Sequence, residues 1–352
     1  MKMVGIILAG GRSSQSQLTQ NYAAASLPVA GYYNAIDFSL SSMVNSGINK
    51  VAVVTQYSSR ALNEHLKSST YWGFGRKHGG LYLVSPMVTA DKQTWYKGTI
   101  DALADTLDIL KESHEPYAVI ASGDGIYRLD YQKVLEKHIE KGAEITVVCT
   151  SLPEGESQER YGVVHRAEDD RIISFSEKAD GDEKAKTISC GIYIIRRRTL
   201  IDMLEKAVAE GKTNFVEDVI IPGLAEGKTY AYKHRGYWEN ISTDEAYYKC
   251  NMSFLDKEIR DEFFAQEPPI LTRVTDRPPT KYLDGAVVKE SLIGSGCVID
   301  GEVSSSVLFA GVTIGKGAVV RNSIVFPNCV IAEGAVIEGV IINKENDIIK
   351  MA

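Results

Sequence analysis

The chain has 352 residues, of which 44% are hydrophobic and 24% are charged, a composition typical of a globular protein with room for one large and one small domain. Its formal net charge of −7 argues against nucleic acid or an anionic membrane as a partner. No stretch approaches the roughly 20 apolar residues of a transmembrane helix, and the apolar run at residues 4–8 is too short for a signal peptide.

The five cysteines are widely spaced, odd in number and without CxxC spacing. This pattern favours reduced, mostly buried thiols in a cytoplasmic protein over a metal or redox role. The cysteines are Cys149, Cys190, Cys250, Cys297 and Cys329.

The beginning of the chain predicts a buried strand followed by a phosphate-facing loop. Residues 4–8 are mostly apolar, and Gly10 and Gly11 follow, where the absence of a Cβ lets backbone N–H groups turn toward an anion. A plain tight turn is the alternative interpretation. From residue 13 to residue 33 there is no Lys, Arg, Asp or Glu, so the loop lacks the cations that a triphosphate would need.

Buried strands then alternate with helices, which predicts a doubly wound α/β sheet. The predicted strands are residues 50–55, 81–84, 117–121 and 145–149, and the predicted helices are residues 36–45, 60–66, 99–110 and 130–141. Ligands of such sheets bind beyond the carboxyl ends of the strands. Gly10, Gln56 and Asp124 follow three of these ends, so we expect them to face one crevice.

The second half of the chain predicts shorter and more antiparallel strands. The predicted strands are residues 161–165, 171–175, 188–195 and 229–232, and the predicted helices are residues 200–210, 215–225 and 245–264. Three arginines at residues 196–198 form a charge run at a strand end. This run is either a solvated surface or a contact for an anion or another subunit.

The composition changes after residue 265, where four of the ten prolines predict an extended linker. The segments I-G-S-G-C-V, I-G-K-G-A-V and I-A-E-G-A-V follow, with apolar residues six positions apart. That spacing is typical of a parallel β-helix, and an ordinary β-domain with glycine turns is the alternative. We therefore expect a large domain at residues 1–265, a linker at 266–281 and a β-helix domain at 282–352.

An ordered set of short motifs resembles one family across nearly the whole chain. The motifs are Leu8-Ala9-Gly10-Gly11, Ile36-Asp37-Phe38, Val44-Asn45-Ser46-Gly47-Ile48, Thr55-Gln56-Tyr57, Trp95-Tyr96-Lys97-Gly98-Thr99, Ser122-Gly123-Asp124, Ile126-Tyr127, Glu177-Lys178 and Gly236-Tyr237-Trp238. Together they resemble the bacterial glucose-1-phosphate adenylyltransferases (ADP-glucose pyrophosphorylases) of glycogen synthesis. The resemblance implies a Rossmann-like nucleotidyltransferase domain with a doubly wound mixed sheet, followed by a short left-handed parallel β-helix.

The resemblance also implies a reaction and a site with two sides. In the family, glucose 1-phosphate attacks the α-phosphorus of ATP in line to give ADP-glucose and pyrophosphate, while Mg²⁺ and cationic side chains stabilise the developing charge. The implied nucleotide side is Gly10, Gly11, Gln56, Gly98, Thr99 and Asp124, and the implied sugar-phosphate side is Glu177, Lys178, Ser189 and Tyr193. From the residues alone, a helix cap at Asp124 and a solvated pair at Glu177 and Lys178 stay open as alternatives.

The chain departs from the family pattern at four positions, where neutral residues replace charged ones. Family members carry cations at the positions of Gln15, Ala24 and Asn34. At the position of Asn240 they carry an aspartate that holds the metal together with the residue matching Asp124. Losing one such stabiliser typically costs about 10²–10³ in rate, so we expect no competent catalytic set and only a weak metal site at Asp124.

A degenerate site on an intact scaffold resembles the GlgD-type subunit, the non-catalytic partner of a catalytic chain. We expect a largely non-catalytic regulatory subunit that joins the Mg²⁺-dependent catalytic glucose-1-phosphate adenylyltransferase subunit in a tetramer, with a sugar phosphate as a candidate effector. An active sugar-nucleotide transferase with an atypical site is the alternative. A hexapeptide-repeat acyltransferase is disfavoured, because the repeat is short and no His lies within residues 286–342.

Overall fold

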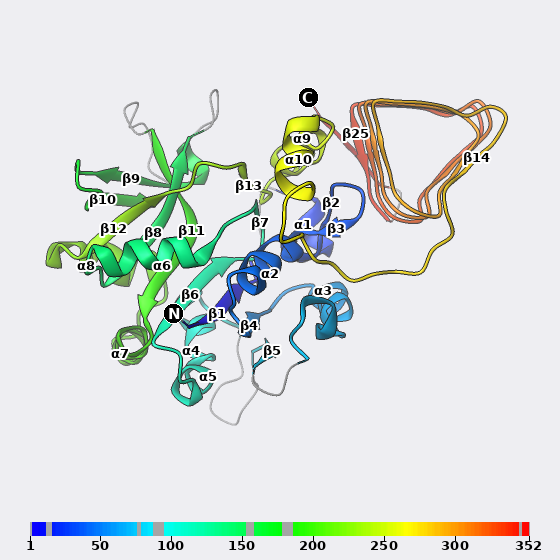
Figure 1. Cartoon of the computed structure of the whole chain (residues 1–352). Helices are drawn as coiled ribbons and strands as arrows, with labels where there is room; N and C mark the ends of the chain where they lie inside the picture. Colours follow the sequence, from blue (N-terminus) through cyan, green and yellow to red (C-terminus); the bar gives the residue numbers. More distant parts are fainter. Residues whose placement is uncertain are drawn as a thin grey trace. The chain divides into compact units, whose positions relative to one another are not determined.

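The computed structural model describes residues 2–11, 16–75, 79–86, 95–152, 158–177, 186–344 and 347–351 (Figure 1). Gln15 and Lys178 lie outside these ranges. Contacts divide the chain into two compact units, which we call the sheet unit and the coil unit. The sheet unit comprises Met1–Gly11, Ser39–Tyr57 and Trp72–Trp238, and the coil unit comprises Arg12–Phe38, Ser58–Tyr71 and Glu239–Ala352. The predicted domain boundaries at residues 265 and 281 stay a prediction.

The sheet unit is built on one mixed β-sheet of nine strands within the described residues. They are β1 (Met3–Leu8), β4 (Lys50–Val54), β5 (Gly80–Val84), β6 (Tyr117–Ser122), β8 (Ile145–Ser151), β9 (Gly162–Arg166), β10 (Ile172–Glu177), β11 (Thr187–Arg196) and β12 (Thr229–Lys233). Their order is β10-β9-β11-β6-β1-β4-β5, and β8 joins β11 to β12. β1 runs parallel to β4 and β6, whereas β11 runs antiparallel to β6 and β8, so the second half is more antiparallel, as predicted.

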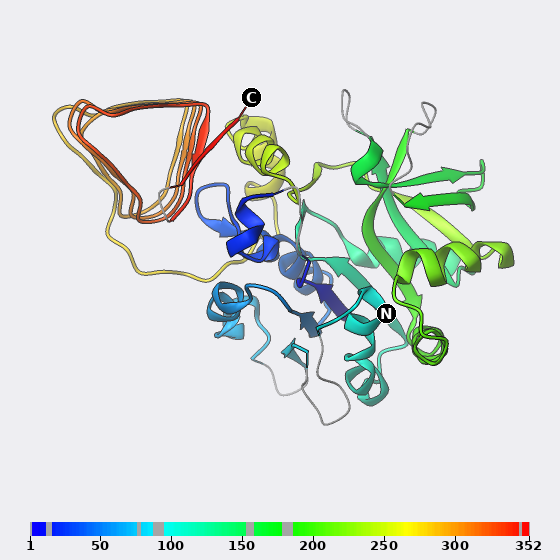
Figure 2. The same cartoon turned by 180° about the vertical axis from the view of Figure 1, so that it is seen from behind.

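Helices cover both faces of this sheet (Figures 1 and 2). α2 (Ala35–Asn45) and α6 (Tyr131–Glu140) cover one face, and α4 (Thr99–Ala104), α5 (Leu107–Glu112) and α7 (Arg197–Ala209) cover the other. β8 is covered on both of its faces. On one face, Thr146 forms a hydrogen bond of 2.9 Å with His138 of α6. On the other face, Ile145 and Val147 belong to the core cluster that includes residues of α4, α5 and α7. Burial on both faces explains why these strands are nearly continuous apolar runs in the sequence.

Buried serines of α2 hold the chain that follows β6. Ser39 Oγ donates to the Ser122 carbonyl at 3.0 Å. The hydroxyl of Tyr127, in β7 (Gly125–Tyr127), donates to Ser39 Oγ at 3.2 Å. A buried polar group left unpaired costs about 1–3 kcal/mol, so these bonds fix the turn that carries Asp124.

The predicted helix at residues 215–225 is wrong in its geometry. The segment forms a π-helical turn η4 (Val216–Ile220), one α-helical turn α8 (Ile221–Gly223) and a 3₁₀ turn η5 (Leu224–Glu226). Pro222 has no N–H, and its ring would meet the carbonyl four residues earlier, so a regular α-helical ladder cannot pass through it. The wider i→i+5 turn accommodates the proline.

The predicted helix at residues 99–110 is split into α4 and α5. At the break, Thr106 Oγ1 donates to the Leu103 carbonyl at 2.6 Å. Short polar side chains of this kind compete with the helical hydrogen bonds, which the apolar spacing alone does not reveal.

The arginine run at residues 196–198 is only partly a solvated surface. Arg196 and Arg198 are exposed. Arg197 donates to the Leu110 carbonyl at 2.8 Å and to the Glu115 carbonyl at 2.7 Å. It therefore satisfies carbonyl groups at and beyond the C-terminal end of α5, which is a structural role.

The coil unit contains the predicted parallel β-helix, whose coils have a triangular outline (Figure 1). Its three sheets are β14 (Lys281–Tyr282), β17 (Val298–Ile299), β20 (Thr313–Ile314) and β23 (Val330–Ile331); β15 (Val287–Lys289), β18 (Glu302–Ser304), β21 (Val319–Arg321) and β24 (Val336–Glu338); and β16 (Leu292–Ile293), β19 (Val307–Leu308), β22 (Ile324–Val325) and β25 (Val340–Ile342). Ile299, Ile314 and Ile331 stack in register on successive coils and are buried, as the hexapeptide spacing predicts. β26 (Ile348–Lys350) pairs antiparallel with β25 and covers part of the terminal edge.

The remaining elements of the coil unit and its borders are short. They are α1 (Leu18–Asn21), η1 (Ala24–Ser26), β2 (Pro28–Val29), β3 (Tyr33–Asn34), α3 (Arg60–Leu66), η2 (Ser69–Trp72), β13 (Trp238–Asn240), α9 (Asp244–Ser253) and α10 (Lys257–Phe264). The predicted helix at residues 245–264 is therefore split into α9 and α10. Asp256 causes the second start, because its side chain accepts from the Glu258 N–H and caps α10.

Asp244 anchors the segment that follows the glycine loop. Its carboxylate accepts from the Ser16 hydroxyl at 2.6 Å. It also accepts from the N–H groups of Gln17 and Leu18, at 2.8 and 3.3 Å. Asp244 is 5% exposed, so a buried carboxylate is the charge that organises this segment.

The predicted fold class, a doubly wound mixed sheet followed by a short left-handed parallel β-helix, is confirmed. No helix in the described ranges is long and apolar enough to cross a membrane. All five cysteines are buried free thiols, as predicted. Burial raises the pKa of Cys149 to about 12, which suppresses thiolate chemistry there.

His138 on α6 is buried in its neutral form. It is 1% exposed, and its Nε2 has no hydrogen-bond partner among the described residues. Burial, with a smaller repulsion from Arg196, lowers the pKa of His138 from 6.5 to about 4. Between these two pH values the unfolded chain binds more protons than the folded chain, so stability falls as the pH decreases through this window.

We therefore expect the free energy of unfolding to decrease from pH 6.5 to about pH 4, on a scale of about 1.4 kcal/mol for each unit by which the pKa is lowered. His138→Asn removes the titrating ring and should flatten this dependence in urea titrations. The matched variant His114→Asn, at an exposed position, should keep it. An unchanged pH dependence in His138→Asn would contradict the assignment.

Candidate functional site

Three strand ends lie side by side in the sheet unit. In the register of the sheet, Leu8 of β1 pairs with Val54 of β4 and with Ser122 of β6. The Ala9 N–H continues this row by donating to the Val54 carbonyl at 2.8 Å. The predicted residues that lie two positions beyond the row are Gly10, Gln56 and Asp124. They share one edge of the sheet, and the crevice expected at this edge stays a prediction.

Gly10 is required by a close approach of two strand ends. A Cβ at Gly10 would lie 3.0 Å from both the Cβ and the backbone N of Gln56, whereas a Cβ at Gly11 would meet nothing within 4 Å. Within the described chain, no hydrogen bond engages the N–H groups of Gly10 and Gly11. The geometry therefore fits a loop whose donors face an anion, and binding itself stays a prediction.

Asp124 follows β6 in a turn and does not cap a helix. β7 begins at Gly125, and the cap of α6 is Asp130, which accepts from the Gln132 N–H at 2.9 Å. Ser122 Oγ donates to Asp124 Oδ1 in a short hydrogen bond. The partly exposed carboxylate thus stands at the strand edge with one oxygen already engaged.

β11 brings two sugar-side residues to the same edge. Its pairing with β8 shifts just after Ser189, and Gly191 lies in the resulting bulge with a φ of +68°. A Cβ at Gly191 would lie 3.6 Å from the Ser122 Cβ. Burial raises the pKa of Tyr193, and the nearby Ser189 lowers it by a smaller amount, so the Tyr193 hydroxyl stays protonated. Ser189 and Tyr193 therefore lie together beside the turn at Ser122.

A segment that the sequence interpretation missed supports the implied nucleotide side. The Thr213 carbonyl lies so close to Gly98 that no Cβ would fit there. The same carbonyl accepts from the Ile100 N–H at 2.9 Å. The Phe215 N–H donates to Thr99 Oγ1 at 2.8 Å. Gly98 and Thr99 thus dock the start of α4 onto this segment, and a nucleotide role for them stays a prediction.

Asn214 links this segment to the implied sugar side. Its Nδ2 donates to Glu177 Oε2 at 2.9 Å, and its Oδ1 accepts from the Val216 N–H at 2.9 Å. Glu177 is therefore held by a partner, which disfavours the solvated-pair interpretation for this residue, while Lys178 lies outside the described residues. The only sequence signal for Asn214 is a helix start before an apolar run, and that signal says nothing about Glu177.

An aromatic pair borders the nucleotide-side edge. Trp95 is 58% exposed, and its ring stacks on Tyr57 with centroids 5.2 Å apart. Tyr57 comes directly after Gln56. Tyr96, by contrast, is buried in the core cluster with Leu8, so Trp95 is a wall residue and Tyr96 is a core residue.

Three of the four positions at which we expect a departure from the family pattern are described in the coil unit, and each has a local role. Ala24 starts the turn η1 and is 7% exposed. The Asn34 N–H donates to Asp37 Oδ2 at 2.8 Å. Asn240 Oδ1 accepts from the Ser242 N–H at 3.0 Å. The fourth departure, Gln15, lies outside the described residues.

The described donors do not assemble a metal centre. Among the residues that the structure describes, no group of three or more His, Cys, Asp or Glu side chains is arranged to hold a metal ion. Mg²⁺ at nucleotide sites is held by one or two carboxylates together with substrate phosphates. Asp124 is one such carboxylate, with one of its oxygens bonded to Ser122, so the weak metal site expected at Asp124 stays a prediction.

Comparisons with known proteins agree with this geometry. The nucleotidyl transferase family model matches residues 4–257, and the model of the GlmU-like C-terminal hexapeptide matches residues 278–352. The glucose-1-phosphate adenylyltransferases of Bacillus thuringiensis (strain Al Hakam) and Bacillus anthracis are each 36% identical to the chain over 348 residues, covering 98% of it and 92% of their own length. That of Geobacillus stearothermophilus is 35% identical over 324 residues, covering 91% of the chain and 83% of its own length. The chain therefore belongs to the glucose-1-phosphate adenylyltransferase family of nucleotidyl transferases.

Proposed function

We propose that this chain is a largely non-catalytic, regulatory subunit of glucose-1-phosphate adenylyltransferase, of the GlgD type. It modulates a catalytic paralogue that makes ADP-glucose from ATP and glucose 1-phosphate. The observation that carries the proposal is the absence of charge from residue 13 to residue 33, directly after the glycine loop. The loop still presents the backbone N–H groups of Gly10 and Gly11, but the segment after it has no Lys or Arg to pair with a phosphate.

The chemistry explains why this loss matters. A transferring phosphoryl group gathers negative charge, which fixed cations and Mg²⁺ stabilise. Ala24 offers only a methyl group, and Asn34 and Asn240 offer neutral amides. Asn240 Oδ1 is also engaged by the Ser242 N–H, so it supports a turn in place of a metal ion.

Two observations favour the alternative, an active sugar-nucleotide transferase with an atypical site. The N–H groups of Gly10 and Gly11 have no partner within the described residues. Glu177 is held in place by Asn214. The sheet unit thus keeps ordered groups on both implied sides of the site, and only an activity measurement separates the two functions.

Assembly with the catalytic subunit, as a tetramer, is part of the proposal. Apolar side chains on the outside of the β-helix support it: Tyr282, Val330 and Val336 are 55%, 65% and 69% exposed. Exposed apolar residues on a repeat structure favour contact with another subunit.

The decisive experiment assays the purified chain alone and after co-expression with a catalytic paralogue. We expect background ADP-glucose synthesis alone, a mixed tetramer in light scattering, and a changed response of the partner to its effectors. Val336→Asp should weaken this assembly, while Val208→Asp, at a 47% exposed position on α7, should not. Full activity of the chain alone would overturn the regulatory function, and a monomer under both conditions would overturn the assembly.

Restoring charge should restore part of the rate. Ala24→Lys with Asn240→Asp returns a cation and a carboxylate, and each change should do little alone because both stabilise one transition state. Together they should raise ADP-glucose synthesis by about tenfold or more, given losses of about 10²–10³ for each missing stabiliser. Gln15→Arg and Asn34→Arg complete the set.

The matched control for this series is Ala24→Met with Asn240→Asp, which has a side chain of similar length without the charge. It should stay at background. A background rate in the well-folded four-fold variant would show that the backbone of the site, and not its charge, has diverged.

A sugar phosphate is the proposed effector, because the implied sugar side keeps its carboxylate. Calorimetry should show tighter binding of glucose 1-phosphate than of ATP. Glu177→Gln keeps the acceptor for Asn214 but removes the charge, and should weaken sugar-phosphate binding by about tenfold. Glu217→Gln, at an exposed position, is the matched control. Tight ATP binding without sugar-phosphate binding would contradict this proposal.

A further inference from the structure

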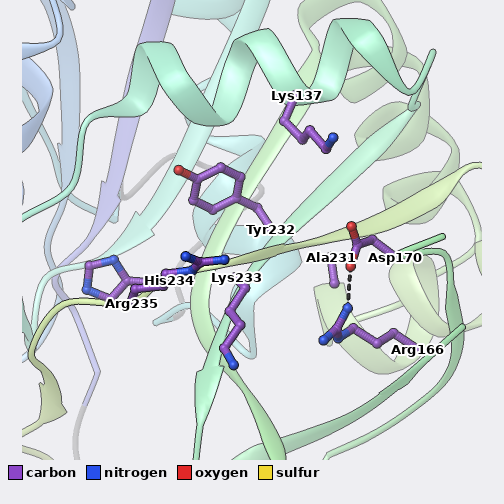
Figure 3. Close-up of a pocket in the computed structure, with 8 residues that line it drawn as sticks. All are labelled: Lys137, Arg166, Asp170, Ala231, Tyr232, Lys233, His234 and Arg235. Atoms are coloured by element: carbon purple, nitrogen blue, oxygen red, sulfur yellow. Dashed lines mark hydrogen bonds and ion pairs between the residues drawn. The ribbon is translucent and has the colours of Figure 1, made fainter. Parts of the chain in front are cut away.

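A cationic pocket lies at the end of β12 in the sheet unit, and none of its residues belongs to the candidate site (Figure 3). Its volume is about 420 Å³, which is within the range of small-molecule sites. The lining residues are Lys137, Arg166, Asp170, Ala231, Tyr232, Lys233, His234 and Arg235. They come from α6, from the end of β9 and the turn after it, and from β12 and the two residues that follow it.

Two of the four permanent cations in this lining are already paired. Arg166 forms a short ion pair with Asp170, drawn as a dashed line in Figure 3. Lys137 pairs with Glu140 at 3.0 Å. Asp170, the one carboxylate among the lining residues that the structure describes, is therefore already paired with Arg166.

The other two cations, Lys233 and Arg235, are exposed. Within the described part of the chain, no carboxylate forms an ion pair with either of them. The molecule as a whole carries a net charge of −7. A positive pocket on a negative protein is a local feature that concentrates anions at one place.

The backbone around these cations is held on both sides. Lys233 pairs with Cys149 in the sheet register, and the His234 N–H donates to the Cys149 carbonyl at 2.8 Å. On the other side of β12, the Ala231 N–H donates to the Asp170 carbonyl at 2.8 Å. The two cations therefore project from a fixed strand end, and ordering them costs less entropy than in a loop.

The ring of Tyr232 forms an apolar part of the pocket lining, and its hydroxyl is a polar group at the end of that ring. Its ring is partly buried, and burial raises the pKa of Tyr232, with Asp130 raising it further and Arg235 lowering it. Asp130 and Glu136 repel an anion from the α6 side of this ring. An anion is consequently favoured away from α6, at the strand end where Arg235 lies near this ring and Lys233 extends from the other side of β12 (Figure 3).

We propose that this pocket is a second binding site of the protein, for a small phosphate monoester. The phosphate lies against Lys233 and Arg235, whose ammonium and guanidinium groups donate charge-assisted hydrogen bonds to its oxygens. The organic part of the ligand lies against Tyr232. The site is independent of the proposed regulatory function, because it shares no residue with the candidate site.

Amide hydrogen exchange of the full chain tests the site, with inorganic phosphate as the first probe and ionic strength held constant with chloride. Phosphate should slow exchange in peptides that cover residues 229–237. The double variant Lys233→Gln with Arg235→Gln should weaken the apparent affinity by about tenfold or more, since each charge-assisted bond contributes on that scale. Unchanged exchange at residues 229–237 in the native protein would overturn the proposal.

Two control variants distinguish binding in this pocket from a general charge effect and from binding at the candidate site. Arg196→Gln with Arg198→Gln removes the same charge from exposed positions of the same unit and should alter the affinity by less than about twofold. Lys178→Gln, on the implied sugar-phosphate side, should leave the protection of residues 229–237 intact. A loss of protection in either control, as large as in the pocket variant, would show that general charge or the candidate site is responsible and would overturn the proposal.

The ester part is tested with glycerol 3-phosphate as the second probe. It should protect residues 229–237 at lower concentrations than inorganic phosphate does, because its organic part contacts Tyr232. Tyr232→Ala should remove this difference while keeping the response to inorganic phosphate. Equal protection by the two probes in the native protein would overturn the assignment of a monoester.

Discussion

The close approach of β1 and β4 at Gly10 is the constraint on which the rest of the candidate site depends. β1 lies between β4 and β6, and Leu8 pairs with both Val54 and Ser122, so the three strands end at one level. A Cβ at Gly10 would lie 3.0 Å from Gln56, so the end of β4 would have to give by a few tenths of an ångström to admit any other residue. On the other side of β1, Ser39 holds the Ser122 carbonyl and with it the turn after β6.

The packing of the sheet unit does not depend on charged residues near the glycine loop. The features that build the sheet unit are buried and apolar, or are short polar side chains that satisfy backbone groups, and none of them needs a charge near the glycine loop. The packing of the sheet unit therefore does not depend on cations in this loop. Asp244 organises the segment after this loop, because its buried carboxylate accepts from the Ser16 hydroxyl and from the N–H groups of Gln17 and Leu18.

Much of the fold could be predicted because burial on both faces turns strands into continuous apolar runs, and because the hexapeptide spacing places Ile299, Ile314 and Ile331 in one stack. The break at Thr106 could not be predicted, because it depends on local competition for a carbonyl group. The irregular turns around Pro222 had a sequence signal in the proline itself, which the apolar spacing obscured. Within the site, strand ends were predictable from the alternation of elements, whereas Asn214 was not. Its bond to Glu177 joins residues 37 positions apart, and no periodicity encodes such a contact.

The pocket at β12 escaped the sequence interpretation for the same reason. Its cations are scattered from Lys137 to Arg235 and meet only because β12 lies between α6 and the turn after β9. Neither composition nor any short motif distinguishes them from solvated surface charges. The roles of Gln15 and Lys178 stay predictions, since both lie outside the described residues.

The number of residues in the bulge at Gly191 determines which face of the sheet Ser189 lies on. Between Ser189 and Ile192, β11 advances three residues while β8 advances one, from Cys149 to Val148. The two extra residues preserve the alternation of the strand, so Ser189 stays on the same face as Tyr193. A deletion or insertion of one residue here would turn Ser189 to the opposite face while leaving the rest of the sheet paired. In this strand the number of residues, and not their chemical identity, decides whether the hydroxyl reaches the edge.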